Sequence, residues 1–239
     1  MESPRRMDGP APRLASSLGR KLLVALTGVA LLLFLAAHLA GNLQVFLGAE
    51  ALNAYSQGLA DLGPLLWVAR LGLIAVAVVH VVVTLQLAAA NREAGARPYA
   101  VAGRVQTRAT TRSMLLTGLL LLLFVLYHLA HYTWGLAHPQ FSQRLDVAGR
   151  HDVYSMVVGS FSVPWIALPY VVAMILLGMH VAHGASSMFQ TFGWRHPRRE
   201  RLLAAVGPAL GGLLAAGYIS IPVAVQLGLV TLPPGVSFP

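Results

Sequence analysis

The chain has 239 residues, a formal net charge of +9 and no cysteine, and 56% of its residues are hydrophobic while only 10% are charged. This composition excludes an ordinary soluble domain and is typical of a membrane protein. The lack of cysteine excludes disulfide bonds, iron–sulfur clusters held by thiolates and covalently attached c-type haem. We therefore expect an all-α membrane protein whose redox centres, if it has any, use other ligands.

The chain opens with a proline-rich basic segment, residues 1–21, which lacks the cleavage pattern of a signal peptide. Five apolar segments follow, each long enough for the roughly 20 helical residues that cross a bilayer core. We expect one five-span membrane domain over residues 22–230, short polar loops, a short tail over residues 231–239 and no separate soluble domain. The expected spans are residues 22–45, 64–90, 114–137, 163–188 and 202–230.

Basic residues are distributed unevenly over the two sides that these spans define. Fourteen lysines and arginines precede the first span or lie in the second and fourth loops, whereas three lie on the other side. Basic residues gather on the cytoplasmic side of multi-pass proteins, so we expect the N-terminus in the cytoplasm and the C-terminus outside. The positive charge then reflects topology and not nucleic-acid binding. The fourteen are Arg5, Arg6, Arg13, Arg20, Lys21, Arg92, Arg97, Arg104, Arg108, Arg112, Arg195, Arg198, Arg199 and Arg201, and the three are Arg70, Arg144 and Arg150.

Each of the first four spans carries a histidine, in AAHLAG (His38), VVHVVV (His80), LYHLAH (His128) and GMHVAH (His180). Ionisable groups are costly inside a membrane and point to function. With a helical rise of about 1.5 Å per residue, His38 and His128 lie roughly 21 to 24 Å from the cytoplasmic edge, near the outer face. The same calculation places His80 and His180 near the cytoplasmic face.

The histidines thus form an outer pair, His38 with His128, and an inner pair, His80 with His180, each pair on two different helices. Two neutral imidazoles at one level are what a haem with two axial histidines requires, and such haems transfer electrons. Four unrelated polar residues bonded to neighbouring helices are the alternative.

Two further histidines, His131 and His183, follow His128 and His180 on nearly the same helix face. Each is a candidate for binding a haem propionate or a quinone, and each is equally a candidate for a simple interface histidine. We interpret His138, His151 and His196 as solvated residues.

Three segments carry a family resemblance: KLLVALTGVALLLFLAAHLAGNLQVFLGAEALNAY, LLLFVLYHLAHYTWG and YVVAMILLGMHVAHGASSMFQTFGWRHPR. They resemble the cytochrome b membrane-anchor subunit of succinate dehydrogenase and fumarate reductase, in its five-helix, two-haem bacterial form. The most specific elements are TG followed ten residues later by HLAGNL, and H-x-x-x-G from His180 to Gly184. The resemblance implies that His38, His80, His128 and His180 bind the iron of two b haems, and it favours His180 over His183. The sequence HVVVT at His80 departs from the H-x-x-x-G seen in some relatives.

The resemblance also implies partners and a location. A flavoprotein with covalent FAD and an iron–sulfur subunit would dock on the cytoplasmic face of a bacterial cytoplasmic membrane, since this chain has no GxGxxG dinucleotide motif and no cysteine. Electrons would pass from the iron–sulfur subunit through the inner and then the outer haem to a quinone. Menaquinone is the quinone that the two-haem form usually implies. A higher oligomer of the complex remains open.

Several polar residues near the membrane edges are weaker candidates. Arg70 would bind an outer-haem propionate or else extend its side chain to the interface. Asp61, in NAYSQGLADLGP, would relay protons at an outer quinone site, where the resemblance implies an acidic residue. Residues at the inner edge would line an inner quinone site or bind lipid headgroups: Ser16, Ser17, Arg20 and Lys21.

Three classes of function therefore compete. The favoured one is the haem-bearing anchor of succinate:quinone oxidoreductase, working in either the succinate-oxidising or the fumarate-reducing direction. The second is a cytochrome b anchor of another respiratory enzyme, such as a hydrogenase or a formate dehydrogenase, which the TG and HLAGNL elements argue against. The third is a transporter with histidine proton relays, which the near absence of intramembrane carboxylates argues against.

Overall fold

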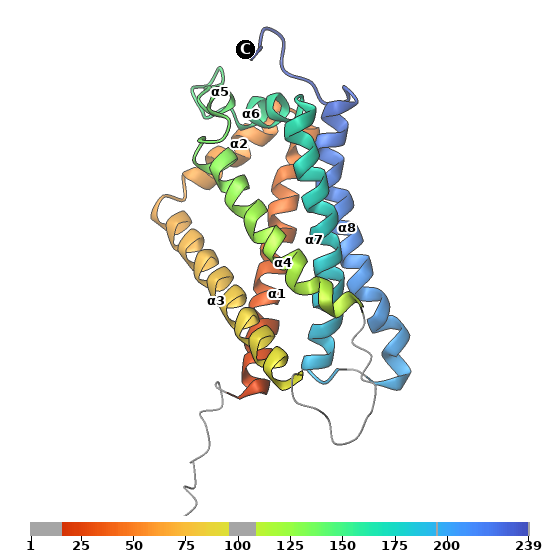
Figure 1. Ribbon diagram of the computed structural model, residues 1–239. Coiled ribbons are helices and arrows are strands. Elements are labelled where there is room, and N and C mark those ends of the chain that lie inside the picture. The colour runs from red at the N-terminus through yellow and green to blue at the C-terminus, as the bar shows by residue number, and fades with distance from the viewer. Residues whose placement is uncertain (1–15, 96–108, 195, 239) are drawn as a thin grey trace, which may run out of the picture.

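The computed structural model describes residues 16–95, 109–194 and 196–238, and in these ranges the protein is all-helical without β-strands. Five helices are long and apolar enough to cross a membrane, which is the architecture of a multi-pass membrane protein (Figure 1). They are α1 (Ser17–Asn42), α3 (Pro64–Gly95), α4 (Ala109–His128), α7 (Pro164–Thr191) and α8 (Glu200–Gln226). Residues 1–15 of the expected tail, and the loop residues Arg97, Arg104, Arg108 and Arg195, lie outside the described ranges.

The ends of these helices follow local capping chemistry. The first helix begins before the predicted residue 22 because the hydroxyl of Ser16 accepts a hydrogen bond from the backbone N–H of Gly19, 3.1 Å away. The second begins at the predicted Pro64. The last ends at Gln226 and not at residue 230, because Gly228 takes a positive φ of 70° that terminates the helix.

One end of the bundle, here called the upper end, is closed by short helices that the sequence did not reveal. They are η2 (Leu43–Leu47), α2 (Ala49–Ala60), α5 (Pro139–Ser142) and α6 (Val153–Phe161). The prediction of short polar loops was wrong here. Residues 154–161 of α6 are all buried, because this helix is apolar but too short to cross a bilayer, and it packs beneath the upper loops instead.

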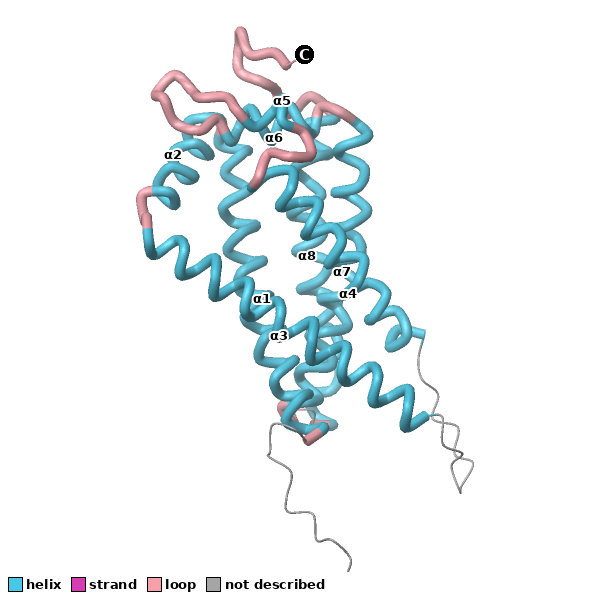
Figure 2. The backbone as a smooth tube through the Cα atoms, turned by 60° about the vertical axis from the view of Figure 1, so that its left-hand side comes forward, coloured by secondary structure: helices cyan, strands magenta, loops and turns pink. Residues whose placement is uncertain are grey.

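The long helices differ in how tightly they pack. Along the α7–α8 contact the backbones touch, since a Cβ added to Gly211 would collide with the carbonyl oxygen of Gly178. By contrast α3 runs obliquely and packs chiefly on α1 (Figure 2). No residue in the apolar window of α3 is buried, so its outward face is available to lipid.

A polar network ties the upper segments together around Asn53, which is 1% exposed. Its amide nitrogen donates to Asp152 Oδ1 at 3.0 Å and to Asp146 Oδ2 at 3.3 Å. Its amide oxygen accepts the backbone N–H of Tyr154 at 2.9 Å. One side chain of α2 therefore holds the N-terminus of α6 and the loop before it.

An ion-pair group lies beside this network. The guanidinium of Arg150 contacts Glu50 at 2.6 Å and Asp146 at 2.7 Å. The hydrogen bond and charge of Arg150 lower the pKa of Glu50 below its ordinary value of 4.5. The stability that this pair contributes is therefore present above pH 4.5 and is lost as the pH falls through the lowered pKa.

Replacing Asn53 with leucine should destabilise the upper end, because the Tyr154 N–H loses its buried acceptor and Asp152 loses a donor. One unsatisfied buried group costs about 1 to 3 kcal/mol. Thermal unfolding of the purified protein in detergent should show a lower midpoint for Asn53→Leu. The matched control is Gln57→Leu on the same helix, which loses one exposed hydrogen bond to Asp61. Equal midpoints for the two variants would contradict this role.

Candidate functional site

The outer pair of histidines comes together near the upper end, between α1 and α4. The ring centroids of His38 and His128 are 6.0 Å apart, with the ring planes at 87°. His38 lies in the last turns of α1, and His128 is the final residue of α4 before a five-residue π-helix, Leu129–Thr133. Two helices thus present one imidazole each at one level.

Aromatic side chains surround the outer pair. Phe34 stacks on His38 at a centroid distance of 5.3 Å, while Phe124 and Tyr170 lie 5.9 and 6.0 Å from His128. The Nδ1 atom of His128 is buried without a hydrogen-bond partner, and among the described residues no side chain or backbone group bonds to either ring. A buried imidazole in apolar surroundings without protein partners fits a role in binding a non-protein group.

The inner pair is placed differently, because each of its rings is held by a threonine. His80 Nδ1 lies 3.0 Å from Thr27 Oγ1, which joins α3 to α1. His180 Nδ1 lies 3.2 Å from Thr117 Oγ1, which joins α7 to α4. His180 also lies within electrostatic reach of His80.

These contacts fix where the proton of the His80 ring resides. Thr27 Oγ1 lies 2.7 Å from the carbonyl oxygen of Leu23, and two oxygens so close need the hydroxyl proton between them. The hydroxyl oxygen can then only accept from the ring, so we assign the proton of His80 to Nδ1. This assignment leaves the lone pair on Nε2, the nitrogen that would face a metal.

The second threonine repeats this arrangement. Thr117 Oγ1 donates to the carbonyl oxygen of Ser113 at 2.9 Å, so it too accepts from Nδ1 of His180. The glycine that follows each threonine lies beside the imidazole: a Cβ on Gly118 would be tight, 3.3 Å from Cε1 of His180, whereas one on Gly28 would be in ordinary contact, 3.5 Å from Cε1 of His80.

The sequence contains a signal for this arrangement that the predictions above did not include. The segments TGVALLLFLAAH (27–38) and TGLLLLLFVLYH (117–128) are identical at seven of twelve positions. In each segment, threonine and histidine are separated by close to three helical turns, so they share one face and lie about 16 Å apart along the axis. The two threonines, each in contact with an inner histidine, therefore lie on the same faces of α1 and α4 as the outer histidines.

His131, a candidate for binding a haem propionate or a quinone, forms hydrogen bonds to the protein through both ring nitrogens. It is 1% exposed, its Nδ1 lies 2.8 Å from the hydroxyl of Tyr170, and its Nε2 lies 3.0 Å from Ser160 Oγ. Ser160 donates its own proton to the carbonyl oxygen of Met156, so Nε2 of His131 carries a proton and Nδ1 accepts from Tyr170. Both nitrogens have partners, which favours the interface-histidine alternative.

The other candidates lie apart from His131 and its hydrogen-bond partners. His183 is half-buried, one turn beyond His180 on α7. Arg70 is exposed and lies over the ring of Trp67, 5.1 Å from its centroid, and Asp61 is exposed and accepts a hydrogen bond from Gln57 at 2.8 Å. No hydrogen bond or ion pair among the described residues joins Arg70 or Asp61 to the four paired histidines. At the opposite, lower end, α1 begins with Ser17, which is exposed, and Arg20 is half-buried.

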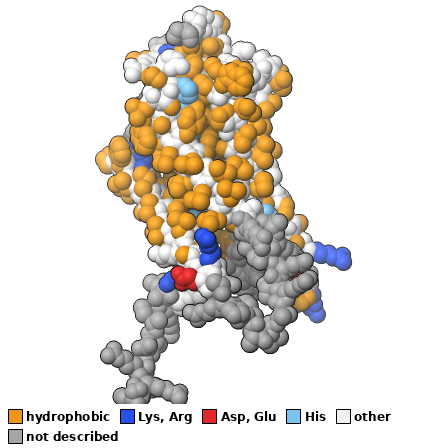
Figure 3. All heavy atoms as spheres, viewed as in Figure 1, with side chains coloured by type: hydrophobic (Ala, Val, Ile, Leu, Met, Phe, Trp, Pro, Cys, Tyr) orange, Lys and Arg blue, Asp and Glu red, His pale blue; other side chains and the backbone are white. Residues whose placement is uncertain are grey.

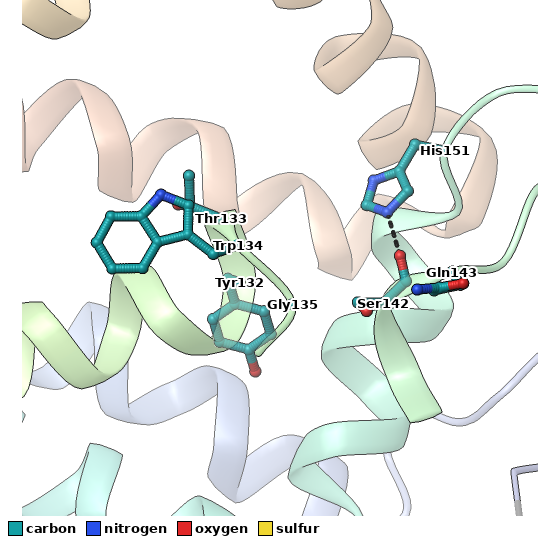
Figure 4. A pocket seen from close by; sticks show the side chains of 7 residues that line it. All are labelled: Tyr132, Thr133, Trp134, Gly135, Ser142, Gln143 and His151. Atoms are coloured by element: carbon teal, nitrogen blue, oxygen red, sulfur yellow. Dashed lines mark hydrogen bonds between the residues drawn. The ribbon is translucent and has the colours of Figure 1, made fainter. Parts of the chain in front are cut away.

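A shallow cavity of about 180 Å³ opens at the upper end (Figure 4). His151 closes one side of it, with Nε2 2.8 Å from the carbonyl oxygen of Ser142. None of the four paired histidines lines this cavity, so it is separate from the two pairs. Its lining residues are Tyr132, Thr133, Trp134, Gly135, Ser142, Gln143 and His151.

The site defines a class of protein by its geometry: a five-span helical membrane protein in which two histidines meet between α1 and α4 and two more are each held by a threonine. Among the described residues, no group of three or more His, Asp or Glu is placed to hold a bare metal ion. No protein family, curated protein or solved structure matches the chain.

The structural assignment of His131 predicts a loss of stability when it is replaced. His131→Leu leaves the buried hydroxyl of Tyr170 without its acceptor, which costs about 1 to 3 kcal/mol. The thermal midpoint of the purified protein should fall, whereas His151→Leu, at an exposed loop histidine, should change it little. An unchanged midpoint together with the loss of a bound cofactor would show that His131 is a ligand.

Proposed function

We propose that this protein is the haem-bearing membrane-anchor subunit of a succinate:quinone oxidoreductase in a bacterial cytoplasmic membrane. The observation that supports it most is the close approach of His38 and His128 between α1 and α4, with two threonine-held histidines about 16 Å further along the same two helices. The resemblance of the segments around His38, His128 and His180 to the two-haem anchor subunits gives the proposal its enzyme class. Fumarate reduction is the same proposal with the reaction running in reverse.

In this proposal His38 and His128 hold the outer haem, and His80 and His180 hold the inner haem. A haem with two axial imidazoles supplies one-electron transfer and leaves no open position for oxygen chemistry. The protein contributes the ligands, the orientation of the inner rings through Thr27 and Thr117, and an apolar shell that excludes water. This subunit carries electrons and does not itself oxidise succinate.

The proposed partners are a flavoprotein subunit with FAD and an iron–sulfur subunit, bound at the lower end. Exposed basic side chains lie there, which is the side expected to face the cytoplasm (Figure 3). The described ones include Lys21, Arg92, Arg198, Arg199 and Arg201. Electrons enter at this end and leave at a quinone, which we propose to be menaquinone.

The proposed orientation of the protein in the membrane also bears on where the quinone binds. At the upper end, Asp61 is an exposed carboxylate that could exchange protons with a quinone oxygen, and Arg70 is an exposed cation for a haem propionate. At the lower end, Ser17, Arg20 and His183 form the alternative set. We propose the outer site, because the electron path from the lower end then passes through both histidine pairs.

An anchor of another respiratory dehydrogenase is the second candidate, because paired histidines between helices would serve it equally. A transporter with histidine relays is the third. A dithionite-reduced optical spectrum of the purified protein separates the third from the others, since only a cytochrome gives the bands of reduced b haem. Reduction of those haems by succinate in native membranes separates the first from the second.

The two histidine pairs predict two non-covalent b haems per chain. Replacing one histidine should remove only the haem that it binds. His38→Ala or His128→Ala should remove the outer haem alone, and His80→Ala or His180→Ala the inner haem alone, because each iron depends on its own two ligands. The pyridine haemochrome assay should give two haems in the wild type and one in each variant.

His183→Ala is the matched control for His180→Ala, because it lies one turn further along α7, and it should keep both haems. A wild-type protein with one haem or none would overturn the proposal. Loss of the inner haem in His183→Ala, with retention in His180→Ala, would instead exchange the two roles.

If the quinone binds at the outer site, replacing Asp61 should impair quinone reduction and leave electron transfer to the haems intact. Asp61→Asn should keep both haems and their reduction by succinate in native membranes, while quinone reductase activity falls by roughly 10²- to 10⁴-fold, the usual contribution of a general acid or base. Glu50→Gln, at the other acid of the same segment, should keep wild-type activity. Normal turnover of Asp61→Asn with menaquinone and ubiquinone analogues would exclude the outer site and favour the set at the lower end.

A further inference from the structure

We infer that Thr27 and Thr117 are positioning residues that make the inner haem site chemically different from the outer one. The inference rests on the proposed function, since it concerns how the inner histidines bind iron. Its basis is the contact of each hydroxyl with Nδ1 of an inner histidine, at 3.0 Å for His80 and 3.2 Å for His180. The outer histidines, His38 and His128, have no such partner among the described residues.

The two hydroxyls are suited to this role because both are buried and both are already committed as donors. Thr27 is 8% exposed and Thr117 is 4% exposed, so water does not compete for their oxygens. Each donates back to the carbonyl of its own helix, at 2.7 Å to Leu23 and 2.9 Å to Ser113. What remains on each oxygen is an acceptor aimed at the imidazole.

A threonine in a membrane helix usually satisfies itself with that backbone bond alone. Here the oxygen makes a second contact, and it does so twice, at equivalent places of a repeated segment and toward different helices. The adjacent glycines, Gly28 and Gly118, lie beside the rings, and at Gly118 a side chain would crowd the imidazole. Two independent copies of the same contact argue against chance packing.

The expected consequence is a change in ligand strength. An acceptor on Nδ1–H fixes the tautomer, orients the ring and raises the basicity of Nε2. A more basic ligand favours ferric over ferrous iron and lowers the midpoint potential. Thr27 and Thr117 therefore lower the potential of the inner haem and strengthen its retention, and they leave the outer haem unaffected.

The test uses native membranes and the purified complex with Thr27→Val and Thr117→Val, which remove the hydroxyl and keep the shape. Redox titration followed optically should show a higher midpoint potential for the inner haem, which is identified as the one that remains in His38→Ala. Retention of that haem on dilution should weaken roughly 10- to 100-fold, the usual effect of removing a group that supports a metal ligand. Thr27→Ser and Thr117→Ser, which restore the hydroxyl, should behave as the wild type.

The control variant is Thr84→Val, because Thr84 bonds only the backbone carbonyl of His80, at 2.6 Å, and its loss should leave both potentials unchanged. Wild-type potential and retention of the inner haem in both valine variants would overturn the inference and leave the proposed function standing. Equal loss of both haems would also overturn it, since the threonines would then serve folding in general. A wild-type protein without haem would overturn the proposed function itself.

Discussion

The structure depends on one constraint: an imidazole buried between apolar helices must find a partner for each ring nitrogen, because an unsatisfied polar group in that setting is costly. Three solutions occur in this chain. His131 obtains both partners from the protein and joins α4 to α6 and α7. The inner pair obtains one partner per ring from a threonine, and the outer pair obtains none from the described residues. The number of hydrogen-bond partners that the protein gives each ring therefore distinguishes the histidine that serves packing from the four that are candidates for binding a non-protein group.

Much of this could be predicted from the sequence because a membrane imposes a fixed scale. Bilayer thickness and helical rise together fix the depth of a residue. Counting residues along the apolar segments therefore predicted that His38 and His128 lie at one level on two helices, and the two rings are neighbours in the structure. The start of α3 at Pro64 was also predicted, whereas the start of α1 at Ser17 was not, because the Ser16 cap precedes the apolar segment. The roles of these residues remain predictions, because no matching family, protein or structure was found that would test them.

What could not be predicted depends on contacts between distant segments. Helix α6 is apolar on all sides, and nothing local distinguishes a buried capping helix from a loop with apolar residues. The commitment of His131 required knowing that Tyr170 and Ser160 would face it from two other helices. The threonine contacts were accessible in principle through the repeated segments at 27–38 and 117–128, but the repeat shows only that two helices are alike and not which histidine each threonine meets.

That repeat extends beyond single helices. Thr27 of α1 bonds His80 of α3, and Thr117 of α4 bonds His180 of α7, so each threonine holds a histidine of its own helical hairpin. Both hairpins run in the same direction, with α1 and α4 rising to the upper end and α3 and α7 returning from it (Figure 1). Each hairpin therefore carries one histidine at the outer level on its first helix and one at the inner level on its second, so a change that shifts one helix along its partner would displace a threonine from its histidine.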